Sequence, residues 1–181
     1  MKLRCVFLSG GINMHMETDR LVIREFAMED LQDLYDILGD EETMANCESA
    51  YSMEKTADFL RDFCISRKGA LAAARKQSGK VIGYILFHEF ESGVYELGWF
   101  FNRAYWKNGY AFEAGKAVTD YAFDSLHAHK IFAETVDGIR SVPLMEKLGM
   151  KREGLQRSQT RTPAGAWADL YLYGILPEDR R

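Results

Sequence analysis

The chain has 181 residues, a hydrophobic fraction of 47% and a formal net charge of −4. That length suits one domain with a substantial core. The small negative charge gives no general attraction to nucleic acid or to anionic membranes, so we expect neither as a partner.

The first 15 residues, MKLRCVFLSGGINMH, carry two early cations and an apolar run, Cys5 to Leu8, that is too short for a signal peptide. We interpret residues 1–15 as a tail or upstream start and residues 16–181 as the folded domain. The three cysteines show no metal or redox spacing, which favours reduced thiols. No apolar stretch approaches the length of a membrane span, so we expect a cytoplasmic protein.

The spacing of apolar residues predicts strands and helices in turn. The elements predicted before residue 90 are a strand at Arg20–Phe26, a helix that ends near Gly39, a helix capped by Ser52, and a hairpin of strands at Leu71–Lys76 and Val81–Phe87.

A strand, a turn and a helix follow between Tyr95 and Leu126. Aromatic and aliphatic residues predict a strand at Glu96–Phe101, and helical spacing of apolar residues begins at Ala111. The turn between them, WKNGYA (residues 106–111), can aim successive backbone N–H groups at one point, where the helix dipole also favours negative charge. The turn therefore predicts a phosphate or pyrophosphate site, although its spacing is neither the dinucleotide pattern nor a P-loop.

The last elements predicted are a strand at Lys130–Val136, a short helix from Ser141 that stops at Gly149, and strands at Glu153–Thr160 and Ala166–Ile175. Ser141 is the expected cap of the short helix.

The turn resembles the pyrophosphate-binding turn of the GCN5-related N-acetyltransferases (GNAT superfamily), Gln/Arg-x-x-Gly-x-Gly/Ala. Trp106, Gly109 and Ala111 take the three defined positions. Tryptophan there, followed by Glu113-Ala114, resembles the branch that includes the ribosomal-protein-alanine N-acetyltransferases.

A second segment, Ser141 to Met150, is similar to the family pattern Asn-x-x-Ser-x-x-x-Leu-Glu-Lys-Leu-Gly-Phe, with Gly138 where the Asn is common and Asp137 one place earlier. The resemblance runs from about Arg20 to Leu176. It implies a single-domain α/β (α+β) fold with a mixed, mostly antiparallel sheet flanked by helices.

The resemblance also implies acetyl-CoA as cosubstrate and direct transfer of its acetyl group to a primary amine, on a protein N-terminus or a small molecule. The residues that it places at the cofactor are Phe100, Phe101, Lys107, Asn108, Gly109, Tyr110, Ala111, Phe112 and Ser141. Among them, Phe101 is the expected backbone donor to the thioester carbonyl, at a splay in the strand.

Two residues are candidates for catalysis. Glu96 matches an acid that acts in the branch as a base through water, or it is a rim carboxylate that attracts a cationic substrate. Many relatives place a tyrosine four residues before the glycine that ends the short helix, but Met145 stands here and cannot donate a proton. Ser141 is the remaining hydroxyl for the leaving sulfur, unless it serves only as the helix cap.

Two questions stay open at this point. A CoA-binding regulatory module without turnover is the alternative to an enzyme, and the oligomeric state is a monomer or a homodimer. His88, His127 and His129 lack ligand spacing, so no metal site is expected. Trp167 and Asp169 begin the last strand, where core or turn roles are favoured over a place beside the acceptor.

Overall fold

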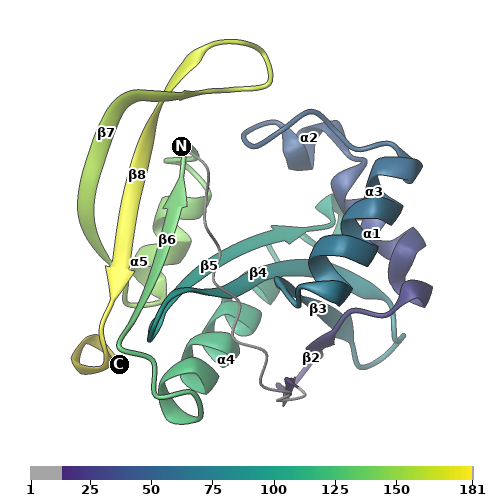
Figure 1. Ribbon diagram of the computed structural model, residues 1–181, viewed down its shortest axis with the longest axis horizontal. Coiled ribbons are helices and arrows are strands. Elements are labelled where there is room, and N and C mark those ends of the chain that lie inside the picture. The colour runs from purple at the N-terminus through teal and green to yellow at the C-terminus, as the bar shows by residue number, and fades with distance from the viewer. Residues whose placement is uncertain (1–13, 181) are drawn as a thin grey trace.

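One sheet of eight strands organises the part of the chain that the computed structural model describes, residues 14–180. The strand order is β1-β2-β3-β4-β5-β6-β8-β7, and β5 and β6 form its parallel pair (Figure 1). The strands are β1 (His15–Glu17), β2 (Leu21–Glu25), β3 (Ala70–Arg75), β4 (Val81–Glu91), β5 (Val94–Phe101), β6 (Lys130–Thr135), β7 (Lys151–Arg161) and β8 (Trp167–Ile175). This mixed, mostly antiparallel sheet with flanking helices confirms the predicted fold class.

Helices cover both faces of the sheet (Figure 1). They are α1 (Leu31–Leu38), α2 (Glu41–Met44), α3 (Met53–Phe59), α4 (Tyr110–Asp124) and α5 (Ser141–Lys147), with a π-helical segment at Leu60–Ser66 and 3₁₀ turns at Met28–Asp30, Arg103–Tyr105 and Pro177–Asp179. Within residues 14–180, no helix is both long enough and apolar enough to cross a membrane.

Side chains along the central strands alternate between the two faces of the sheet, so the apolar residues form two cores. On one face, Leu97 and Phe101 of β5 pack with Val118 of α4 and Met145 of α5. On the other face, residues from α1, α3 and the π-helical segment pack with Tyr84 of β4. The sheet is therefore buried on both sides, and α4 lies opposite α1 and α3.

The structure adds two elements that the sequence did not predict. Strand β1 pairs His15 with Arg24 of β2, so the described fold includes the last residue of the expected tail, and the rest of that tail up to residue 13 lies outside the described residues. The short helix α2 lies in the segment after Gly39 and is capped by Asp40, whose carboxylate accepts from the Thr43 amide.

Strands β5 and β6 separate along their length. Their parallel pairing ends at Glu96 and Phe132, whereas β5 stays paired with β4 as far as Phe101. The carboxyl-terminal half of β5 therefore has an open edge toward β6, which matches the splay that the family resemblance implies.

Candidate active site

A cavity of about 830 Å³ passes through the splay. One part is lined by the turn after β5, by the start of α4 and by α5, including Lys107, Phe112 and Ser141. The other part lies on the α1 and α3 face, where Tyr51 and Glu96 line it. Because the cavity joins the two faces of the sheet, a ligand at the turn and a second ligand at Glu96 can meet at the edge of β5.

The turn before α4 presents donors that have no acceptor among the described residues. Gly109 is left-handed, with φ 81°, and Lys107 is also left-handed, with φ 61°. The first helical bond of α4 runs from the Glu113 amide to the Gly109 carbonyl, and the amides of Tyr110, Ala111 and Phe112 make no hydrogen bond within residues 14–180. These are the free N–H groups of a helix start, which suit an anion.

Polar contacts hold this turn against the sheet. The Asn108 side chain donates to the carbonyls of Trp106 (2.9 Å) and Tyr105 (3.3 Å). Arg20 donates to the Asn108 carbonyl (3.0 Å) and pairs with Glu113, which also accepts from the Arg20 amide (2.9 Å). The turn is thus shaped before any ligand binds, which reduces the ordering that binding requires.

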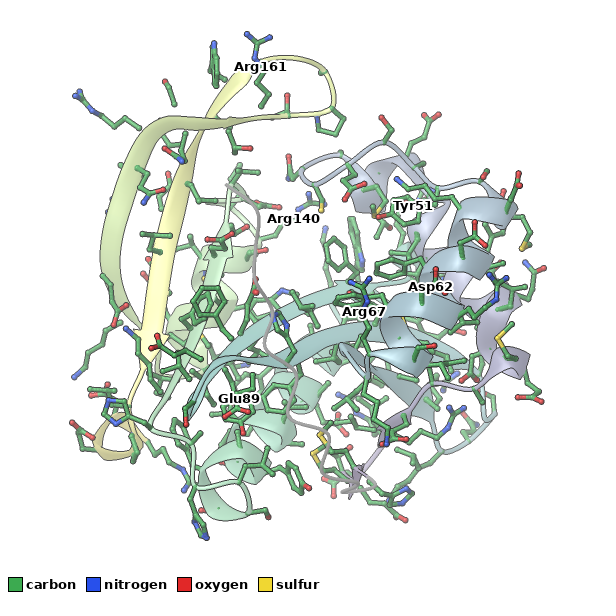
Figure 2. All side chains as sticks on the ribbon, viewed as in Figure 1. Tyr51, Asp62, Arg67, Glu89, Arg140 and Arg161 are labelled. Atoms are coloured by element: carbon green, nitrogen blue, oxygen red, sulfur yellow. The ribbon has the colours of Figure 1, made fainter. Side chains whose placement is uncertain are left out.

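Trp106 links the turn to the end of β5 and to the loop before α5. Its indole N–H donates to the Phe101 carbonyl at 2.6 Å, and the Arg140 guanidinium lies 4.8 Å from the centre of its ring. Figure 2 shows Arg140 in the space between β6 and the α2 segment. Asp137 binds the Arg140 side chain and accepts from the Ile139 amide at 3.0 Å.

Backbone amides also face the splay. The Asn102 amide donates to Ile82 of β4. Because amides alternate sides along a strand, those of Phe100 and Gly98 face β4, whereas those of Phe101 and Trp99 face the open side. The Phe101 side chain is buried in the α4 core, so the residue combines a packing side chain with an available N–H.

Glu96 is a half-buried carboxylate that lines the cavity. Burial raises its pKa, and the charge of Glu134 on β6 raises it further. The Nε2 atom of His88, on β4, lies 3.4 Å from a Glu96 carboxylate oxygen. Burial lowers the pKa of His88, which favours a neutral ring. Glu96 is therefore a carboxylate with an unusually basic character for its type.

Ser141 is not the helix cap that the sequence predicted. It is the first residue of α5; Arg140 occupies the cap position without a side-chain cap bond, and the carboxylate of Asp137 accepts from the Arg140 amide at 2.9 Å. The Ser141 hydroxyl makes no hydrogen bond with another described residue, and Ser141 lines the cavity with Met145. The Asp137 carboxylate instead orders the loop before the helix, and the Asp137 carbonyl accepts from the Val142 amide of α5 at 3.3 Å.

The structure brings most of the predicted residues together. Those that line the cavity are Glu96, Phe100, Phe101, Lys107, Gly109, Tyr110, Ala111, Phe112 and Ser141. Asn108 is the exception, because its side chain is used in shaping the turn.

Trp167 and Asp169 lie outside the cavity. Trp167 is 60% exposed, so the suggested core role is wrong. The Arg161 guanidinium lies 4.4 Å from the centre of its ring. The Asp169 carboxylate accepts from the amide of Ser158, a left-handed residue in β7, and so supports the strand irregularity there.

Among the residues that sequence reasoning did not assign to the site are Arg20, His88 and Glu134. Arg20 is far from the turn in sequence, and no local pattern shows their contact. Simple counting from the turn would place Glu89 opposite Glu96; the register shift between Glu89 and Glu91 brings His88 there instead. In the parallel register, Phe132 lies beside Glu96, so Glu134 points to the same face two residues later.

Comparisons with known proteins agree with this geometry. A family model described as an acetyltransferase (GNAT) domain matches residues 20–151. The uncharacterized N-acetyltransferase YnaD of Bacillus subtilis (strain 168) is 35% identical over 170 residues, covering 92% of this chain and 99% of that protein. The crystal structure of a GNAT-family acetyltransferase from Bacillus anthracis has a TM-score of 0.83 and 30% identity, covering 91% of this chain and 99% of that chain.

A more distant structure shares the fold. The ribosomal-protein-S5-alanine acetyltransferase from Vibrio fischeri has a TM-score of 0.78 and 17% identity, covering 93% of this chain and 100% of that chain. At this identity the likeness shows the architecture alone.

Proposed function

This chain belongs to the GNAT family and is an N-acetyltransferase, and we propose that it transfers the acetyl group of acetyl-CoA to a primary amine by direct attack. The observation that carries the proposal is the meeting, in one cavity, of free amides at the start of α4, open amides on β5 and the half-buried Glu96. The three features answer the three demands of the reaction: an anchor for the pyrophosphate, a donor to the carbonyl and an acceptor for a proton.

The residues at the turn fit the pyrophosphate of acetyl-CoA. The amides of Tyr110, Ala111 and Phe112 are free to donate, and the helix dipole adds to their attraction for an anion. A Cβ atom on Gly109 would lie 3.5 Å from the Arg20 guanidinium and would project from a left-handed residue, so glycine leaves the backbone accessible. Lys107, which is exposed and lines the cavity, adds positive charge.

Acetyl-CoA supplies an activated acyl group with a thiolate as its leaving group. Glu96 takes a proton from the incoming ammonium, directly or through water, so that the nitrogen lone pair is free to attack the carbonyl carbon. The Phe101 amide stabilises the negative charge that develops on the carbonyl oxygen. As the carbon–sulfur bond breaks, the Ser141 hydroxyl donates a hydrogen bond to the sulfur, and the proton released by the new amide neutralises the thiolate.

The acceptor enters from the α1 and α3 face. This part of the cavity holds the carboxylates of Glu96 and Glu134, and its walls include the rings of Tyr51 and Phe59. Carboxylates attract an ammonium group and aromatic walls suit an apolar body or a cation. We propose a primary amine on a protein N-terminus or on a small molecule as the acceptor.

The experiment measures thiol release from acetyl-CoA by the purified protein with a panel of primary amines and N-terminal peptides. If the proposal is correct, thiol release depends on an amine, and the mass spectrum shows the matching acetylated product. A regulatory CoA-binding module would instead be stabilised by acetyl-CoA in thermal unfolding, with no amine in the panel raising thiol release above the background rate.

A further inference from the structure

We propose that His88 is a positioning residue for Glu96, holding its carboxylate toward the acceptor amine through an imidazole N–H donor. This inference rests on the proposed role of Glu96 as the base, and it concerns a residue on a different strand from the reacting groups.

The register of the sheet places the two side chains together. His88 on β4 lies directly opposite Glu96 on β5, and facing residues of antiparallel strands project from the same face. The gap between His88 Nε2 and the Glu96 oxygen is 3.4 Å, and the side chains are only 10% and 18% exposed. A small rotation of either side chain closes this gap to hydrogen-bond distance.

His88 has no other partner among the described residues. Both ring nitrogens are buried, and neither makes a hydrogen bond within residues 14–180. A buried donor without an acceptor destabilises the folded state, so such groups normally have a partner. Glu96 is the carboxylate within reach of Nε2, so the pairing gives that nitrogen an acceptor.

Burial favours a neutral imidazole at His88, and an N–H donated by that ring would offset the burial and the Glu134 charge that disfavour the ionised form of Glu96. Burial lowers the pKa of His88. The ionisable groups set against Glu96 are Glu134 of β6, which raises its pKa, and Tyr84 of β4, whose own pKa is raised by burial and by the Glu96 charge. A donated N–H stabilises the ionised form of Glu96, so loss of the donor should raise the pKa of the base further.

Two substitutions test whether His88 acts as a hydrogen-bond donor or only fills space. H88F fills the volume without an N–H, whereas H88Q keeps a donor. For H88F we expect the acid limb of kcat/KM for the amine to move to higher pH, so that the rate on that limb falls about tenfold for a shift of one pKa unit. The KM for acetyl-CoA should stay unchanged, and H88Q should recover most of the rate. H129Q, at an exposed histidine in a loop, is the matched control.

Two kinetic results would contradict the proposal. If H88F and H88Q lose the same rate with an unmoved pH profile, His88 only packs. Loss of acetyl-CoA affinity in both variants would likewise place His88 in a structural role.

A second readout does not depend on turnover. Nitrogen NMR of histidine-labelled protein reports the protonation and tautomer of each ring, and H88Q identifies the His88 signal among the four histidines. In E96Q we expect the His88 ring resonances and pKa to change, while those of His129 do not. Identical titration of His88 in wild type and E96Q would overturn the pairing even if the enzyme is active. Absence of wild-type turnover, by contrast, would count against the proposed function alone.

Discussion

Burial of Glu96 favours its role as a base but makes the folded protein less stable once the carboxylate is ionised. Desolvation, and then the charge of Glu134, raise its pKa above the ordinary value of 4.5. A base with a raised pKa accepts a proton more readily near neutral pH. The same shift means that the folded state holds the proton more tightly than the unfolded chain. Its favourable contribution to stability is therefore present at low pH and is lost as the pH rises through the folded pKa.

The first prediction is that E96Q lowers turnover and raises thermal stability at neutral pH. We expect kcat/KM for the amine to fall about tenfold or more, with the larger loss at acidic pH, because at high pH the amine is already neutral. The melting temperature should exceed that of wild type at pH 7 and should match it below the ordinary pKa. Paired pH profiles of rate and melting temperature check this. A variant with full rate and an unchanged profile would make Glu96 a rim carboxylate.

The second prediction concerns Ser141, which the structure removes from the cap position. S141A should lower kcat and kcat/KM together, by about tenfold if the hydrogen bond to the sulfur is worth about 1.4 kcal/mol in the transition state. Its melting temperature should change little. The control is S52A, because the Ser52 hydroxyl does cap α3 by accepting from the Lys55 amide at 3.1 Å.

The two serines should show opposite behaviour. S52A should lose about 1 kcal/mol of stability and keep its turnover. If S141A behaves as S52A does, water and not Ser141 assists the departing thiolate.

At the scale of elements, two left-handed residues form the turn before α4. Lys107 adopts φ 61° and Gly109 adopts φ 81°, a conformation that glycine reaches without steric cost. Arg20 and Asn108 hold the turn in this shape. The sequence pattern WKNGYA therefore encodes both a helix start and a cluster of free amides.

The third prediction is that G109A weakens acetyl-CoA binding beyond the cost of backbone strain. The matched control is G79A, since Gly79 is also left-handed (φ 72°) and a Cβ there meets no atom within 4 Å. Both variants should lose about 1–2 kcal/mol of stability from the left-handed conformation. G109A alone should show a reduced thermal shift with acetyl-CoA. Equal shifts in both variants would show that the turn does not contact the cofactor.

Elements with strong local signals were predicted from the sequence. Strand β2, helix α1, the β3–β4 hairpin and helix α4 have clear periodicity or caps, and the structure contains each of them near the expected bounds. The short elements β1 and α2 were missed, since a few residues carry no period and depend on pairing or on a single cap. The cap of α5 was assigned to the wrong residue because Ser141 is a favoured cap type, whereas the helix begins one residue earlier, with Arg140 at the cap position.

At the scale of the whole molecule, the site depends on contacts that no local pattern shows. The splay exists because β6 leaves β5 after Glu96, and its expectation came from the family resemblance and not from periodicity. The cofactor-binding turn could be predicted from the sequence because its residues are consecutive. His88, Glu134 and Arg20 come from three other strands or strand ends, and only the sheet register joins them to the site.

The cavity in the splay makes the central claim testable by one measurement, amide hydrogen exchange with and without CoA. CoA should slow exchange in the carboxyl-terminal half of β5, in the turn from Lys107 to Gly109 and in the first turn of α4, since these amides gain acceptors or shelter. Exchange in α3 and β7 should be unchanged. Unaltered exchange in the turn at saturating CoA, or protection confined to other elements, would contradict the placement of the cofactor.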